Sequence, residues 1–208
     1  VVTTGDELNQ VVSEDNNYDY IYLENDITLT SGFIINPNKS KIIIDGTYNN
    51  VKSTYTNNLE SLEENVIKAS TKNKEIILKN MNIISSSGYG VIYVPSHPNY
   101  SNVVVEYNNV NFTGIELSQN YYGTTKIIDS VIEVKDTNNV LAQKACDSNN
   151  VLIGGITSIN SSAVDKPVIF LNDVIPSTLK IMPNSKVTIT TKEELMNGTN
   201  RLDLIVGH

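Results

Sequence analysis

The chain has 208 residues, of which 39% are hydrophobic, and this is enough apolar material for one folded all-β domain. Its formal net charge is −8, its only arginine is Arg201, and lysines do not cluster anywhere in it. This composition argues against nucleic acid and anionic membrane as partners, because both are bound by clustered lysine and arginine. No stretch reaches the ~20 apolar residues of a membrane span, so no membrane insertion of this domain is expected.

Residues 5–13 are predicted to form a short amphipathic helix. The four residues 4–7 read TGDE, which has the S/T-x-x-E form of a capping box, and Leu8, Val11 and Val12 follow at helical spacing. A coil of stacked strands has an apolar cross-section at each end that must be covered. We therefore expect this helix to cover the first coil.

Six later segments share one strand pattern, in which a run of Ile, Val or Leu is followed by a small or polar residue and then by another β-former. The segments are 41–51, 75–84, 103–112, 126–134, 150–159 and 179–189. Their small or polar residues are Gly46, Asn80, Asn109, Ser130, Gly155 and Asn184. The middle copies align on Met81, Val110, Val131 and Ile156, at intervals of about 29, 21 and 25 residues, and such periods indicate a solenoid.

The small or polar residue in each copy is predicted to form a corner between two strands of one coil. Asn and Gly enter left-handed backbone conformations at low cost, and the chain contains 29 Asn residues. Stacked coils would align these Asn side chains into hydrogen-bonded ladders. The alternative is an ordinary β-sandwich, although sandwiches usually show turn signals every ~8–12 residues and no recurrence at coil length.

The C-terminal end is predicted to be capped as well. Residues 191–194 read TKEE, which repeats the S/T-x-x-E pattern ahead of Leu195 and Met196, and Asn197 with Gly198 forms a typical helix stop signal. A final strand is expected from Leu202 to Val206. Residues 1–208 are therefore expected to form one capped domain. The single cysteine, Cys146, is expected to be a buried small hydrophobe.

Three long loops are predicted to interrupt the coils, at 53–74, 85–102 and 113–125. The first is expected to hold a helical turn through Leu59, Leu62 and Val66 that lies over a lateral face. The other two carry the residues that we predict to bind a ligand: Tyr89, Tyr93, Tyr100, Gln119, Asn120, Tyr121 and Tyr122. Tyrosine rings give large contact areas at low entropic cost, and amides add adaptable hydrogen bonds, which suits sugars or extended protein segments. Alternatively, such tyrosines pack their rings on the coil and expose only their hydroxyls.

The sequence shows no catalytic constellation. A β-elimination needs a strong base and usually Ca²⁺ held by several acidic groups, whereas Lys79, Lys126 and Lys135 are isolated and Arg201 is near the end of the chain. The carboxylates of Asp45, Glu106 and Asp129 could stack near one face, and a hydrolase would need two of them ~5–9.5 Å apart across a groove. His97 lies in a proline-bracketed loop without companion ligands. No metal and no cofactor are predicted, with Ca²⁺ as the only candidate ion.

Three parts of the chain resemble the pectate lyase-like adhesive domains found in surface proteins of Gram-positive bacteria. The first is the helix at 5–13 followed by Ile21, Leu23, Asp26-Ile27 and Ile44-Asp45-Gly46. The second, at 106–132, is similar to the pattern "Y-x-N-V-x-Y/F-x-G … N-x-x-G … I-x-D-S" through Tyr107, Asn109, Val110, Phe112, Gly114, Asn120, Gly123, Ile127 and Asp129-Ser130. The third, at 142–155, resembles "Q-x-x-A … V-x-I-G-G". The chain departs from the family at 114–117, where Pro-Gln is expected after the glycine, and at Cys146, where an acidic residue would be usual.

The resemblance implies a right-handed parallel β-helix in an exported, wall-attached protein, with an adhesive or ligand-presenting role. We therefore expect residues 1–208 to be one monomeric, extracellular domain of a longer multidomain protein at the bacterial surface or cell wall. This domain is expected to recognise a host or matrix glycan or protein without catalysing a reaction. Two alternatives stay open. One is a spacer that projects other domains from the wall, and the other is a lyase or hydrolase acting on uronic-acid glycans.

Overall fold

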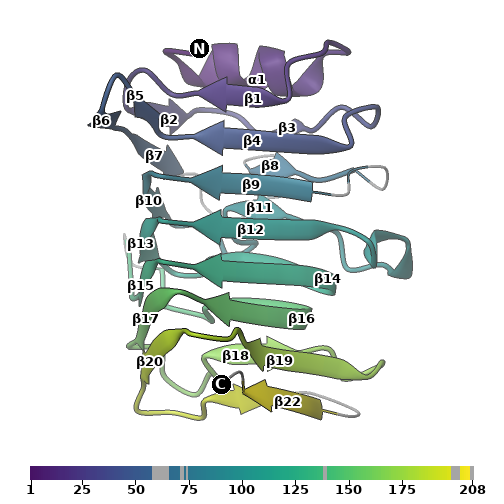
Figure 1. Cartoon of the computed structure of the whole chain (residues 1–208), viewed down its shortest axis with the longest axis vertical. Coiled ribbons are helices and arrows are strands. Elements are labelled where there is room, and N and C mark those ends of the chain that lie inside the picture. Colours follow the sequence, from purple (N-terminus) through teal and green to yellow (C-terminus); the bar gives the residue numbers. More distant parts are fainter. Residues whose placement is uncertain (58–65, 71–72, 74, 138–139, 198–201, 207–208) are drawn as a thin grey trace.

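The computed structural model describes residues 1–57, 66–70, 73, 75–137 and 140–197, together with the backbone of 202–206. Within these residues the chain winds into a rod of stacked coils, with its strands lying one above another along the rod (Figure 1). Strands of successive coils pair in parallel. The predicted parallel β-helix is therefore confirmed, and the β-sandwich alternative is wrong. No helix among the described residues is long and apolar enough to cross a membrane.

The strands line three lateral faces of the rod, here called A, B and C. Face A contains β1 (Tyr20–Tyr22), β4 (Lys41–Asp45), β9 (Glu75–Lys79), β12 (Val104–Asn108), the second halves of β14 (Ser118–Ile128) and β16 (Cys146–Gly154), β19 (Ser177–Ile181) and β22 (Leu202–Val206). Face B contains β2 (Ile27–Leu29), β7 (Thr54–Asn57), β10 (Asn82–Ser85), β13 (Asn111–Gly114), β15 (Val131–Val134), β17 (Ile156–Ser161) and β20 (Lys186–Thr190). Face C contains β3 (Phe33–Ile34), β8 (Ile67–Lys68), β11 (Ile92–Tyr93), the first halves of β14 and β16, β18 (Ile169–Leu171) and β21 (Met196–Asn197).

The core consists of the inward-facing residues of all three faces, because successive side chains of a strand point to opposite sides. On face A one buried row contains Ile42, Ile76, Val105, Thr125, Val151 and Leu179. Tyr107 and Phe112 are the largest of the inward side chains from β12 and β13, and each is at most 1% exposed. Burying side chains of this size contributes about 1.5–3 kcal/mol each.

Helix α1 (Gly5–Ser13) confirms the predicted N-terminal cap. Its first turn is held by Thr4, whose Oγ1 accepts a hydrogen bond from the backbone N–H of Glu7 at 3.2 Å. The Glu7 carboxylate accepts from the N–H and hydroxyl of Thr3 instead of reaching Thr4, so the capping box is not reciprocal. Leu8 and Val12 are fully buried, and the helix lies against β2 and β3.

The predicted corners are largely confirmed. Asn80, Asn109, Gly155 and Asn184 have positive φ. At the corner predicted for Ser130, the left-handed residue is its neighbour Asp129 (φ 49°). Gly46 does not have positive φ; it is needed for close approach, because a Cβ there would lie 2.3 Å from the Cβ of Met81.

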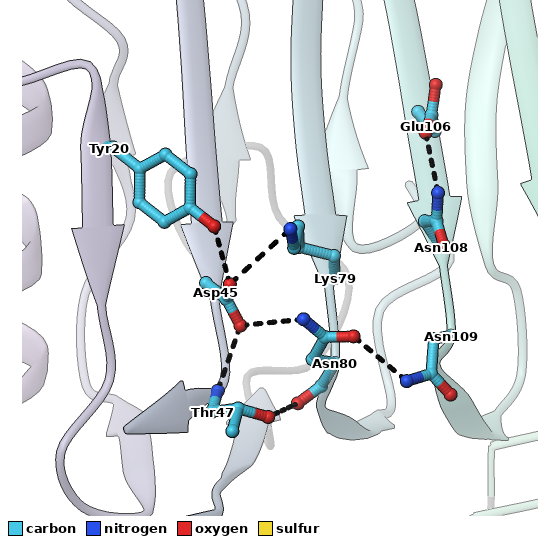
Figure 2. Close-up of polar contacts among 8 residues, drawn as sticks. All are labelled: Tyr20, Asp45, Thr47, Lys79, Asn80, Glu106, Asn108 and Asn109. Atoms are coloured by element: carbon cyan, nitrogen blue, oxygen red, sulfur yellow. Dashed lines mark hydrogen bonds and ion pairs between the residues drawn. The ribbon is translucent and has the colours of Figure 1, made fainter. Parts of the chain in front are cut away.

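The predicted asparagine ladder is also present (Figure 2). The Asn109 amide donates to Asn80 Oδ1 at 2.9 Å, and the Asn80 amide donates to Asp45 Oδ1 at 3.0 Å. The predicted alignment of the later coils is wrong. Val131 pairs with Asn111, and Ser158 pairs with Val131, so neither Val131 nor Ile156 is equivalent to Met81.

Two other predictions are wrong, and one lies mostly outside the described residues. Residues 113–125 do not form a loop, because most of them belong to β13 and β14. Residues 191–197 do not form a capping helix: Thr191 Oγ1 accepts from the Glu193 N–H in a turn, and Met196–Asn197 pairs with β18. The loop at 85–102 contains β11 and a 3₁₀ helix, η2 (Pro98–Tyr100). Of the residues in the predicted flap, only Val66 is described, and it is buried.

Candidate functional site

The structure divides the predicted ligand-binding residues into two tyrosine pairs and a set of structural side chains. The rings of Tyr89 and Tyr93 lie 5.0 Å apart, and those of Tyr121 and Tyr122 lie 5.2 Å apart. All four tyrosines are partly exposed. Gln119 lies between the two pairs on face C, because it is the register partner of Tyr93 and is on the same strand, β14, as Tyr121 and Tyr122.

Two of the predicted residues have structural roles instead. Asn120 is fully buried, and its amide donates to the carbonyls of Val103 and Thr124 at 3.1 and 3.0 Å. Tyr100 packs its ring against the hydrophobic core from η2. The alternative interpretation of loop tyrosines as packing residues therefore describes Tyr100 well.

Along the rod, face C has one row of side chains on the outer side of its strands, which we call the outer row. Its members are register partners on successive strands: Ile34, Lys68, Tyr93, Gln119, Asp147, Phe170 and Asn197. Within it Asp147 is buried, with 6% of its surface exposed. Neighbours in such a row are about 4.8 Å apart. Lys68 Nζ lies 5.5 Å from the centre of the Tyr93 ring, in a cation–π contact. Besides Ile34, the row therefore contains two aromatic, two charged and two amide side chains, evenly spaced on successive strands.

A bulge in β14 carries Tyr121 and Tyr122 outward beside this row. The register with β16 shifts between Asn120 and Thr124, and a Cβ on Gly123 would lie 2.2 Å from Asn120 Oδ1. The sequence Asn-Tyr-Tyr-Gly is therefore required locally: the Asn amide fills the inside of the bend and the Gly allows the chain to pass it.

The ring of Tyr121 is held in place by residues of the coil that contains β18, two coils further along the rod. It stacks on Phe170 with centroids 6.4 Å apart and an interplanar angle of 22°. Its hydroxyl donates to the Asp173 carboxylate, and its carbonyl accepts from the Asn172 amide at 3.0 Å. Partial burial and the hydrogen bond to Asp173 raise the pKa of Tyr121 to about 12. Tyr121 is thus a fixed aromatic surface in the unbound protein.

A second cluster, on face A, was missed by the sequence analysis. Figure 2 shows the side chains of Tyr20 and Lys79 converging on Asp45 from neighbouring strands. Asp45 Oδ2 accepts from the Tyr20 hydroxyl at 2.7 Å and lies 3.6 Å from Lys79 Nζ, while Oδ1 accepts from the Thr47 N–H and the Asn80 amide, each at 3.0 Å. The sequence Tyr-Asp-Tyr-Ile-Tyr at residues 18–22 could have indicated this cluster. Every second residue of a strand faces the same side, so its three tyrosines are expected on one face.

Comparison with known protein families gives one match. A family model described as the pectate lyase-like adhesive domain matches residues 1–119, which is more than half of the chain. The chain belongs to this family. No curated protein and no solved structure was found to match it. Family membership indicates an adhesion-type module with an extracellular partner, and the description of the family suggests a non-catalytic role.

The adhesive domain has a buried charged cluster that includes Asp147 of the outer row. Glu116 is 2% exposed, and burial raises the pKa of its carboxyl to about 8. Lys144 Nζ lies 2.9 Å from Asp147 Oδ2, and burial also raises the pKa of Asp147. Although burial alone would lower it, the neighbouring carboxyls of Glu116 and Asp147 raise the pKa of Lys144.

The cluster keeps unpaired hydrogen-bonding capacity. Among the described residues, Glu116 Oε1, Gln119 Oε1 and Asp147 Oδ1 are buried without a hydrogen-bond donor. Cys146 is buried beside them, and burial raises the pKa of its thiol. Glu116 and Cys146 therefore belong to one buried cluster with Lys144 and Asp147.

The carboxylates weighed for catalysis are all engaged in the adhesive domain. Glu106 is paired with Lys126 at 3.5 Å and accepts from the Asn108 amide, and Asp45 is held as described above. Asp129 accepts from the Ile156 N–H at its corner. His97 accepts from the Asn99 N–H and caps η2. Within the described residues, no three His, Cys, Asp or Glu side chains are grouped closely enough to hold a metal ion.

Proposed function

We propose that this adhesive domain is a non-catalytic module that binds a host or matrix glycan or protein through face C, on an exported protein displayed at the cell wall of a Gram-positive bacterium. The observation that carries the proposal is the fixed position of Tyr121. Its ring is held by Phe170 and Asp173 on the bulge of β14, beside the outer row. A ring that is already ordered loses little conformational entropy on binding.

The outer row gives this surface a length suited to an extended partner. From Lys68 to Phe170 the row crosses four strand spacings, which is about 19 Å along the rod. Tyr93 lies towards one end, Tyr121 lies beside Phe170 at the other, and Gln119 lies between them. Aromatic contacts separated by hydrogen-bonding groups suit a polymer that runs along the rod.

The test is binding of the fluorescently labelled domain to immobilised matrix proteins and glycans. The double variant Tyr121→Ala with Tyr122→Ala should lose saturable binding and keep the wild-type circular dichroism spectrum. Ile156→Ala is the matched control, because its side chain is 76% exposed and lies at a corner away from face C. Binding that survives the double substitution would refute face C as the binding surface, and absence of wild-type binding at micromolar concentration would refute the adhesive function of this domain.

A spacer is the second candidate, and the shape of the molecule favours it. Helix α1 lies at one end of the rod and β22 at the other (Figure 1), as in a module that separates its neighbours. A spacer would tolerate the Tyr121 and Tyr122 substitutions without any loss of binding by the full protein. We do not propose a uronic-acid lyase or hydrolase, because the candidate carboxylates have structural partners.

A further inference from the structure

We propose that face A carries a second binding site, separate from face C, which takes a neutral sugar. The site is the tyrosine patch, defined as Tyr18, Tyr20, Tyr22 and Tyr48, together with the adjoining Asp45–Lys79 pair. It lies at the N-terminal end of the rod on β1 and the β5 (Thr47–Tyr48) to β6 (Val51–Lys52) hairpin. This site is independent of the function proposed for face C.

The patch contains the most exposed tyrosines described in the chain. Tyr18 is 67% exposed, Tyr20 41% and Tyr22 37%. The rings of Tyr20 and Tyr22 are 4.8 Å apart, and those of Tyr22 and Tyr48 are 6.1 Å apart. The rings therefore form a continuous aromatic surface from strand β1 to the hairpin. Stacking of apolar faces on such rings is a common mode of binding for ligands with one apolar and one polar side.

Polar groups lie directly beside these rings and are fixed by the corner of the coil. The Tyr20 hydroxyl, the Thr47 N–H and the Asn80 amide all donate to Asp45 (Figure 2). Although partial burial opposes it, these hydrogen bonds and the nearby Lys79 lower the pKa of Asp45, so it is ionised at neutral pH. The Lys79 ammonium has three N–H donors and contacts both Asp45, at 3.6 Å, and the Tyr20 hydroxyl. Its third donor is suited to a ligand hydroxyl group.

The charges around the patch select against ionised ligands. Asp45 and Lys79 compensate each other. A cationic ligand would meet Lys79, whose Nζ already lies 5.6 Å from the centre of the Tyr20 ring in the position that the cation would take. An anionic ligand would meet Asp19 and Glu24, which are exposed at either end of β1, in a chain of net charge −8. A neutral sugar avoids both repulsions because it carries no charge. Its C–H face can stack on tyrosine, and its hydroxyls can accept hydrogen bonds from Lys79.

An apolar hollow adjoins the patch and limits the size of what it can hold. The hollow has a volume of about 360 Å³ and is lined by Val1, Val2, Val11, Tyr18, Tyr20 and Ile21. This volume is at the low end for small-molecule sites, which are about 300–1,000 Å³. It suits one or two sugar rings, with the rest of an oligosaccharide continuing over Tyr22.

The test is an array of neutral oligosaccharides of glucose, galactose, mannose and N-acetylglucosamine, printed beside uronate-, sialic acid- and sulfate-bearing glycans. The wild-type domain should bind at least one neutral series, and Tyr22→Ala should weaken that binding about tenfold or more. Lys79→Met, which keeps the length of the side chain and removes its donors, should weaken it as well. Ile156→Ala, at an exposed side chain outside both surfaces, is the matched control and should leave the neutral-sugar signal unchanged. Tyr121→Ala is measured in parallel to report on face C.

The Tyr121→Ala variant separates this proposal from the function of face C. A neutral-sugar signal lost in Tyr121→Ala and kept in Tyr22→Ala would overturn the tyrosine patch and support face C. Loss in Tyr22→Ala alone supports the patch whatever the ligand of face C is. No binding to any neutral glycan, or equal binding to the acidic ones, overturns the proposal, provided that thermal unfolding shows every variant to be folded.

Discussion

Replacing Glu116 by glutamine should change how the stability of the domain depends on pH. The carboxyl is fully buried, and burial raises its pKa from the ordinary 4.5 to about 8, with Asp147 adding to the rise and Lys144 and Lys166 opposing it. Each pKa unit corresponds to about 1.4 kcal/mol, so the difference between the folded and unfolded chains amounts to about 5 kcal/mol as an upper bound.

The sign follows from which state holds the proton. Between pH 4.5 and about 8 the folded protein keeps Glu116 protonated while the unfolded chain has released the proton. The free energy of unfolding should therefore fall as the pH rises through this range and become level above it. The glutamine amide of the variant does not titrate and has nearly the same shape as the carboxyl. The Glu116→Gln protein should therefore lack the decrease in the free energy of unfolding that Glu116 causes as the pH rises.

The assay is urea denaturation of the wild type and of Glu116→Gln at several pH values from 5 to 9. The two proteins should be similar in stability near pH 5, and the variant should be the more stable by several kcal/mol above pH 8. Glu24→Gln, at an exposed glutamate, is the matched control and should follow the wild type. Parallel stability curves for the wild type and Glu116→Gln would show that the buried carboxyl does not retain its proton, and the reasoning would fail.

Three further predictions concern the bulge, the corners and the thiol. Gly123→Ala should lower the free energy of unfolding by about 2–4 kcal/mol, because the added Cβ would clash with backbone and with Asn120. Gly88→Ala, whose Cβ would have no atom within 4 Å, should change it by less than about 0.5 kcal/mol. Equal shifts of the two variants in thermal unfolding would contradict this prediction. Asn80→Ala should lower the free energy of unfolding by about 1–3 kcal/mol, because it loses the ladder hydrogen bonds and places alanine at φ 54°. Asn80→Gly loses the same hydrogen bonds but tolerates this φ, so it should lower the free energy of unfolding less. An alanine variant as stable as the glycine variant would count against strain at the corner. Cys146 should react with maleimide only after unfolding, because burial raises the pKa of its thiol, and labelling of the native protein would contradict its burial.

The sequence predicted the parts of the fold that depend on local chemistry. The N-terminal helix was marked by Thr4 at its cap and by the spacing of Leu8 and Val12, and the structure has both features. Asn80 and Asn109 were recognisable as corners because asparagine is one of the few residues that adopts positive φ cheaply. Their ladder followed from stacking.

The errors arose where pairing between coils overrides local preference. The corner before Val131 turns at Asp129, and the corner before Ser158 contains one additional residue, the exposed Ile156. Aligning the coils by their apolar residues alone therefore placed Val131 and Ile156 out of register. The polar β14 was predicted as a loop because only its pairing with β12 and β16 makes it a strand. The turn at Thr191 has a capping motif, but pairing with β18 decides the outcome.

The candidate site was predicted in part for the same reason. Tyr121 and Tyr122 could be chosen from their composition, but Asn120 could not be recognised as a buried support without knowing the position of the Val103 carbonyl. Tyr20 was missed because the alternating tyrosines of residues 18–22 were not singled out in the sequence. Its importance arises from Asp45 and Lys79, which are 25 and 59 residues away and become neighbours only through stacking.

The parallel pairing of successive coils also determines how the domain would respond to mechanical load. The backbone hydrogen bonds between coils run along the rod, with α1 at one end and β22 at the other (Figure 1). Tension applied through those ends would load only the few bonds of the outermost coil at a time, so the rod would peel coil by coil at low force instead of failing as a unit. A tether of this kind extends gradually and dissipates energy under flow.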